Sequence, residues 1–168
     1  MALLFVLAGC QATLTPAPAP VRDFAFATNW QVRETGEPAR CEDMLNVWEY
    51  GFTVTDPSRV ISITEQYVGS APAGVEPRRE TRTINRWQSG SDWVRVRHTF
   101  PPGDTFVPVS VADDFDAQSI VIVPEPVTPT EWNGETSFRV SVRYETSYGE
   151  RTVSSPWWHV DSYRNCAR

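Results

Sequence analysis

Lysine is absent from this sequence of 168 residues, and all 15 basic side chains are arginine. This absence excludes chemistry that needs a lysine side chain, such as a Walker A phosphate loop, a Schiff base or a Ser-x-x-Lys acyl-enzyme. Histidine is scarce, with only His98 and His159. The H-E-x-x-H, C-x-x-C, G-x-G-x-x-G and G-x-S-x-G motifs are also missing. The sequence therefore gives no support to a zinc hydrolase, a thioredoxin-like protein, a dinucleotide-binding protein or an α/β-hydrolase.

Positive charge is outweighed by negative charge, since 21 acidic residues give a net charge of −6. Binding to nucleic acid depends on neutralising phosphates, so we expect no nucleic-acid partner. Apolar residues make up 40% and charged residues 21% of the chain, which is enough to pack a core. We expect no cofactor and no metal. The acidic run Asp113, Asp114 and Asp116 lacks the spacing and the distal glutamate of a calcium loop.

The first nine residues form a short apolar stretch that ends in small residues before Cys10, a pattern typical of a secretory signal. Nine residues rise about 14 Å as a helix, too little for a hydrocarbon core of about 30 Å. The sequence Leu7-Ala8-Gly9-Cys10 resembles the lipobox of bacterial lipoproteins. The resemblance implies cleavage before Cys10 and lipidation of its thiol. The residue after the cysteine is Gln11 and not aspartate. In the family that the lipobox resembles, this implies lipid anchoring in the outer membrane, facing the periplasm or the cell surface.

This resemblance divides the chain into three parts. Residues 1–9 are the expected signal peptide, residues 10–22 the lipidated cysteine and a proline-rich tether, and residues 23–168 a single all-β domain. Alternate prolines favour an extended spacer of about 3 Å per residue. A dozen such residues span about 35 Å at most, so we expect partners close to the membrane.

Two cysteines remain once Cys10 is acylated, namely Cys41 and Cys166. In an exported, oxidising compartment, two cysteines predict a disulfide. The alternative is a pair of free thiols. Metal binding is a poorer interpretation, because no further cysteine or histidine lies near either residue in the sequence.

From Val21 onward the dominant hydrophobic period is two. The clearest case is residues 137–145, where Phe138, Val140, Val142 and Tyr144 share one face. Strands are predicted over residues 24–33, 47–54, 59–67, 80–87, 93–100, 105–111, 119–123, 137–145 and 151–158. Residues 80–87 and 93–100 are expected to form one hairpin, and residues 137–145 and 151–158 another.

These eight or nine strands predict an all-β fold, an antiparallel β-sandwich of immunoglobulin-like size, with an up-and-down eight-stranded barrel as the alternative. His98 shares its parity with apolar neighbours and is expected to be a hydrogen-bonded core or rim residue. The predicted core consists of the residues on the inward parity: Phe24, Phe26, Trp30, Trp48, Tyr50, Phe52, Ile61, Ile63, Val94, Val96, Ile120, Ile122, Phe138, Val140 and Val142.

Six arginines cluster around the first predicted hairpin, and two tryptophans accompany them: Arg78, Arg79, Arg82, Arg86, Arg95, Arg97, Trp87 and Trp93. If the two strands present these side chains on one face, they form a surface that binds a carboxylate, a phosphate, a sugar ring or a protein. The alternative is a solvated sheet face whose arginines pair with neighbouring acids.

The sequence thus favours a membrane-anchored envelope lipoprotein that acts as a non-enzymatic binding or scaffolding module. Its expected partners are the membrane, through the lipid, and an envelope protein or glycan. A lipocalin-like carrier of a small apolar ligand is the first alternative, and it depends on the closed barrel. A hydrolase is the second, and it needs a serine, a histidine and an acid in hydrogen-bond reach, starting from His159 and Asp161. No catalytic residue is assigned.

Overall fold

The computed structural model describes residues 19–70, 78–103 and 122–168. The strands are β1 (Val21–Thr28), β2 (Trp30–Val32), β3 (Pro38–Cys41), β4 (Asn46–Val54), β5 (Val60–Ser70), β6 (Arg78–Ile84), β7 (Gln88–Ser89), β8 (Trp93–Phe100), β9 (Glu125–Val127), β10 (Glu131–Thr146), β11 (Gly149–Ser154) and β12 (Trp158–Arg164). A 3-10 turn, η1 (Pro57–Arg59), precedes β5. No helix within these ranges has the length and apolar character needed to cross a membrane. The predicted strand 105–111 and most of 119–123, including Ile120, lie outside the described residues.

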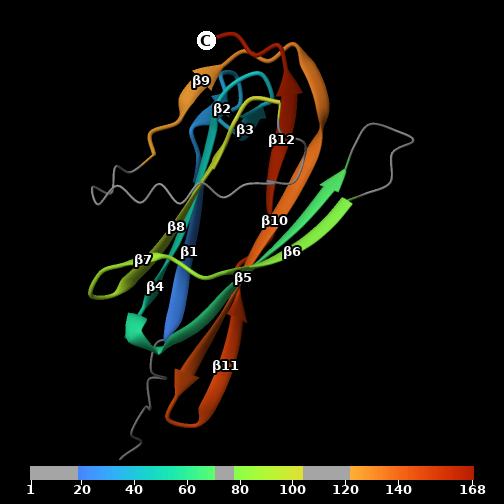
Figure 1. Cartoon of the computed structure of the whole chain (residues 1–168). Helices are drawn as coiled ribbons and strands as arrows, with labels where there is room; N and C mark the ends of the chain where they lie inside the picture. The colour runs from blue at the N-terminus through green and yellow to red at the C-terminus, as the bar shows by residue number, and fades with distance from the viewer. Residues whose placement is uncertain (1–18, 71–77, 104–121) are drawn as a thin grey trace, which may run out of the picture.

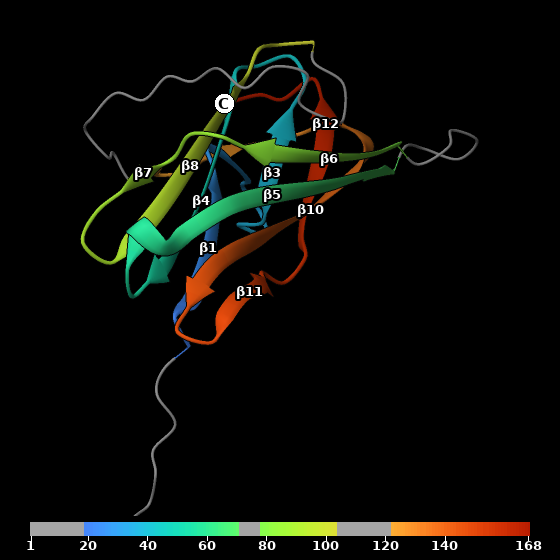
Figure 2. The same ribbon diagram turned by 60° about the horizontal axis from the view of Figure 1, so that its bottom comes forward.

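The strands form two packed sheets. The four-stranded sheet has the order β1-β4-β8-β7, and the eight-stranded sheet has the order β6-β5-β10-β12-β3-β2-β9, with β11 added beside β10. Figure 2 shows β5 and β10 running across the face of β1 and β4. The predicted sandwich is confirmed. The barrel alternative is wrong, because among the described strands β1 and β7 end one sheet while β6 and β9 end the other.

The core lies between the two sheets and follows the predicted parity closely. In β4, Trp48, Tyr50 and Phe52 are buried while the residues between them are half-buried. Phe138 of β10 meets the four-stranded sheet, with its ring centre 5.5 Å from that of Tyr50. Aromatic rings from both sheets therefore fill the interior.

Among the predicted core residues that the structure describes, Ile61 is the exception, since it is 39% exposed. The ladder between β5 and β10 shifts register at this point, because Arg143 faces Ser62 whereas Tyr144 faces Val60. The extra residue is left without a partner across the ladder, and the parity of the strand reverses. Val60 is consequently buried in the place that alternation assigns to Ile61.

The hairpin predicted from residues 80–87 and 93–100 is wrong. β6 pairs with β5 in the eight-stranded sheet, whereas β8 pairs with β4 and with the short β7 in the four-stranded sheet. The chain changes sheets between Ile84 and Gln88, so strands that are neighbours in sequence are not neighbours in space. Alternation indicates a strand but does not identify its partner.

The second predicted hairpin is confirmed, since β10 and β11 pair from Ser141↔Ser154 to Thr146↔Gly149. The predicted strand 151–158, however, ends at Ser154 and a new strand begins at Trp158. Pro156 has no N–H for a ladder, which favours a break there. The predicted strand 24–33 is divided in the same way: β1 belongs to the four-stranded sheet and β2 to the eight-stranded sheet.

The predicted disulfide is confirmed and forms the centre of a second, smaller core. Cys41 and Cys166 are bonded, with their Cα atoms 5.9 Å apart and a sequence separation of 125. Trp30, Ala39 and Val127 pack around them. This core lies at the end of the sandwich that carries the C-terminus, opposite the end where β1 begins (Figure 1).

Candidate functional site

The six arginines of the predicted surface are divided between two different sheets and the segment that joins them. Arg78, Arg79 and Arg82 belong to β6, and Arg86 follows it, whereas Arg95 and Arg97 belong to β8. The predicted hairpin was the only reason to place them together, and it does not form.

Several of these side chains form ion pairs or aromatic contacts with neighbouring residues. Arg82 pairs with Glu80 on its own strand, and Arg97 pairs with Glu49 on the neighbouring strand, with its Nη2 2.7 Å from the carboxylate. The Arg95 guanidinium lies 5.0 Å from the ring centre of Trp93. Trp87 packs against the main core. These contacts match the alternative of a sheet face whose arginines pair locally.

A buried polar cluster joins the two sheets at the centre of the sandwich. Glu65 of β5 is fully buried, and His98 of β8 is 1% exposed. One Glu65 oxygen accepts the hydroxyl of Tyr50 at 2.6 Å and lies 2.6 Å from Nε2 of His98. The other oxygen accepts the hydroxyl of Tyr67 at 2.8 Å. The prediction of a hydrogen-bonded core histidine is confirmed.

This cluster stabilises the packing of the sheets. Burial, followed by the nearby Glu65 charge, holds the pKa of both Tyr50 and Tyr67 well above its ordinary value. Both phenols therefore remain hydrogen-bond donors across the physiological range. Glu65 was not predicted as part of a site, although a carboxylate on the same parity as Ile63 and Tyr67 is a visible signal in the sequence.

A cleft of about 500 Å³ opens beside β12. We call it the β12 cleft, and it is lined by Phe26, Glu37, Pro38, Glu135, Trp157, Trp158, His159 and Asp161. The cleft contains His159 and Asp161, from which the hydrolase alternative starts. Pairing of β10 with β12 places Ser137 opposite His159.

The geometry around His159 differs from that of a catalytic triad. The Ser137 hydroxyl lies 3.1 Å and the Glu135 carboxylate 2.9 Å from the same ring nitrogen, Nδ1. Ser137 also donates to Glu135 at 2.9 Å. A triad needs the acid and the nucleophile on opposite nitrogens of the imidazole. Here the serine proton is directed to the carboxylate, and no relay through the ring is formed.

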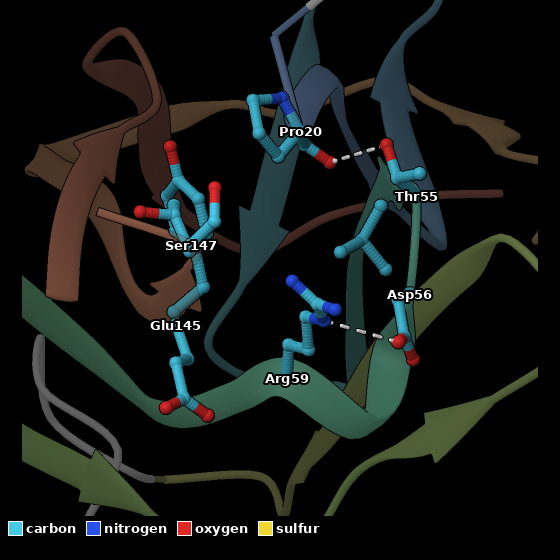
Figure 3. Close-up of a pocket in the computed structure, with 9 residues that line it drawn as sticks. Pro20, Thr55, Asp56, Arg59, Glu145 and Ser147 are labelled. Atoms are coloured by element: carbon cyan, nitrogen blue, oxygen red, sulfur yellow. Dashed lines mark hydrogen bonds and ion pairs between the residues drawn. The ribbon is translucent and has the colours of Figure 1, made fainter. Parts of the chain in front are cut away.

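A second cavity, of about 620 Å³, lies at the end of the sandwich where the chain enters β1. We call it the tether-end pocket, and it is lined by Pro20, Val54, Thr55, Asp56, Arg59, Tyr144, Glu145, Thr146 and Ser147. Figure 3 shows Arg59 reaching into this pocket.

Two contacts shape the tether-end pocket. The Arg59 Nε lies 3.3 Å from Asp56, and the Thr55 N–H donates to the Pro20 carbonyl at 2.9 Å. Ser58 donates to Asp56 from its hydroxyl and its backbone N–H, and these bonds lower the pKa of that carboxyl. The charged lining consists of one guanidinium and two carboxylates, so this pocket has no strong preference for an anion.

No group of three or more histidine, cysteine or acidic side chains in residues 19–70, 78–103 and 122–168 is arranged to hold a metal ion. The acidic run at 113–116 and Cys10, the predicted lipidation site, lie outside the described residues. Comparisons with known protein families and with curated proteins found no match to this chain.

Proposed function

We propose that this chain is a lipid-anchored lipoprotein of the bacterial envelope, whose sandwich domain acts as a non-enzymatic binding module. The observation that carries the proposal is the sequence Leu7-Ala8-Gly9-Cys10, which places a cysteine directly after an apolar stretch and small residues. The bond between Cys41 and Cys166 supports it, because structural disulfides are typical of exported proteins.

The arrangement of the domain suits a tether at one end. Pro20 bonds to Thr55 near the start of β1, whereas the C-terminus, to whose segment the disulfide ties β3, lies at the opposite end of the sandwich (Figure 1). An acylated Cys10 would hold the Pro20 end within about 35 Å of the bilayer. The other end and the sides of the sandwich then remain free for an envelope protein or a glycan.

The surface supports binding better than catalysis. The best serine, histidine and acid constellation in the described part of the chain places Ser137 and Glu135 on one nitrogen of His159. A proton cannot pass from the serine through the ring in that arrangement. Glu135 and His159 also line a cleft that contains two tryptophans, a residue type enriched at protein interfaces.

Cell fractionation combined with crosslinking tests this proposal. The wild-type chain is expected in the membrane fraction and crosslinked to a second envelope component. The Cys10→Ser variant is expected to leave the membrane fraction and to lose that crosslink, because the tether no longer holds it near its partner. A wild-type chain that stays soluble and forms no crosslink contradicts the proposal.

A further inference from the structure

Part of β12 lacks a paired neighbour on one side in the described eight-stranded sheet, beside the β12 cleft. β3 pairs with β12 only from Asp161 to Tyr163. Pro38 begins β3, and proline has no N–H to extend the ladder. No described strand pairs with Trp158, His159 and Val160 on the side away from β10. This short edge of β12 runs along the cleft.

The lining of the cleft carries an excess of negative charge. Glu37, Glu135 and Asp161 contribute three carboxylates, and no arginine lines the cleft within the described ranges. Asp161 accepts from the Trp132 indole N–H at 2.9 Å and from the Tyr163 hydroxyl at 3.3 Å, and both donors are uncharged. Its charge is therefore held in place by hydrogen bonds without being neutralised.

Glu135 adds a second ionised group. The hydrogen bond from His159 and the smaller contribution of the Ser137 hydroxyl lower the pKa of the Glu135 carboxyl. Among the described residues of the lining, His159 alone has a basic side chain, and that side chain is 60% exposed. Even a charged His159 leaves the lining net negative.

Tryptophan supplies the apolar part of the cleft. The Trp157 ring is 38% exposed and already has the Arg139 guanidinium 4.7 Å from its centre. Trp158 stacks on Phe138 of the core with 5.4 Å between ring centres. Trp158 also stacks on Phe26, with 5.3 Å between ring centres. The indoles therefore offer apolar surface beside the carboxylates, which suits the alkyl stem of an arginine or lysine side chain whose charged end pairs with an acid.

We propose that the β12 cleft binds an extended segment of a partner protein that carries arginine or lysine. The segment pairs with the edge of β12 at Trp158–Val160 and places its cationic side chain among Glu37, Glu135 and Asp161. The edge, which no strand in the described ranges covers, favours a polypeptide over a glycan, because it offers main-chain pairing. This inference rests on the proposed binding function and names the class of partner.

Titration of the purified full-length chain with synthetic peptides tests the inference. The probe is the acetylated and amidated peptide Thr-Val-Arg-Val-Thr, and the matched probe has glutamine in place of arginine. The arginine peptide is expected to shift the amide resonances of Trp158, His159 and Val160 and to bind at least about fivefold more tightly than the glutamine peptide. Acetyl-arginine amide, which cannot pair as a strand, is expected to bind more weakly than the arginine peptide.

Two variants locate the effect. Glu37→Gln and Asp161→Asn each remove one charge from the cleft, and each is expected to weaken the arginine peptide about fivefold. The control, Glu145→Gln, removes the same charge from the tether-end pocket at the other end of β10 and is expected to leave binding unchanged. The circular dichroism spectrum of each variant confirms that it folds.

Three results would overturn the inference. The first is equal binding of the arginine and glutamine peptides, and the second is equal loss of binding in Glu145→Gln and Glu37→Gln. The third is binding of a chito-oligosaccharide, but of neither peptide, at the same amides. None of these outcomes affects the membrane anchor, which fractionation of the Cys10→Ser variant decides separately.

Discussion

At the scale of single residues, the most constrained site is the carboxylate of Glu65, which serves three donors inside an otherwise apolar interior. Removing one member of such a group leaves the others buried without a partner, and this costs more than the hydrogen bond itself contributes. Because Glu65 belongs to one sheet and His98 to the other, the group also fixes how the sheets face each other.

We predict that His98→Leu and Glu65→Leu each lower the free energy of unfolding by about 3–5 kcal/mol. The double variant is expected to lose less than the sum of the two, with a coupling of about 1–3 kcal/mol. Urea denaturation of the four proteins measures this coupling. The exposed pair Arg143 and Glu150 is the control, with an expected coupling below about 1 kcal/mol. Additive losses at Glu65 and His98 would contradict the geometry.

The two buried phenols make stability depend on alkaline pH. Tyr50 and Tyr67 have a raised pKa in the folded protein, so they stay neutral while the unfolded chain ionises near pH 10. Their contribution is complete below about pH 10 and is lost as pH rises further. In an absorbance titration at 295 nm, both are expected to ionise only together with unfolding. Tyr67→Phe should reduce the absorbance change that accompanies unfolding and leave unchanged the change at lower pH that comes from the other tyrosines.

At the scale of strands, alternation of apolar and polar residues was enough to predict most elements and the faces they bury. It failed where the backbone departs from strict pairing. The bulge that exposes Ile61 has no glycine or proline to mark it in the sequence. The exchange of sheets between β6 and β8 depends on long-range pairing, and the hydrophobic period contains no information about partners.

The bulge predicts unequal effects at two isoleucines that alternation treats alike. Ile63→Ala empties a fully buried position and is expected to cost about 2–5 kcal/mol, whereas Ile61→Ala is expected to cost less than about 1 kcal/mol. Thermal unfolding of the two variants makes the comparison. Equal destabilisation would mean that inward and outward side chains alternate along the whole of β5, without the bulge.

The candidate sites were less predictable than the strands. The arginine surface was inferred from proximity in sequence, and it depended on a hairpin that does not form. The β12 cleft combines Glu37 with residues 135–161, so only the tertiary fold brings its lining together. His159 and Asp161 were visible as candidates, but the roles of Ser137 and Glu135 depend on distances that a sequence does not contain.

At the scale of the whole molecule, two features hold the ends of the domain. The disulfide closes a loop of 125 residues and ties β3 to the C-terminal segment. Pro20 joins the opposite end through its carbonyl and Thr55. Pro20 and the disulfide thus lie at opposite ends of one sandwich.

We predict that the Cys41→Ser/Cys166→Ser variant loses about 2–5 kcal/mol of unfolding free energy, since it releases a long loop in the unfolded chain. Guanidinium denaturation under oxidising conditions measures the loss. Reductant should lower the stability of the wild-type chain to the same level and leave the variant unchanged. A wild-type chain insensitive to reductant would show that the bond contributes nothing.

The proposed function depends on the lipid at Cys10, which mass spectrometry of the N-terminal peptide from the membrane fraction detects. We expect a peptide that begins at Cys10 and carries the mass of a diacylglyceryl group, usually with an additional acyl chain. Recovery of an unmodified peptide that still contains residues 1–9 would contradict it.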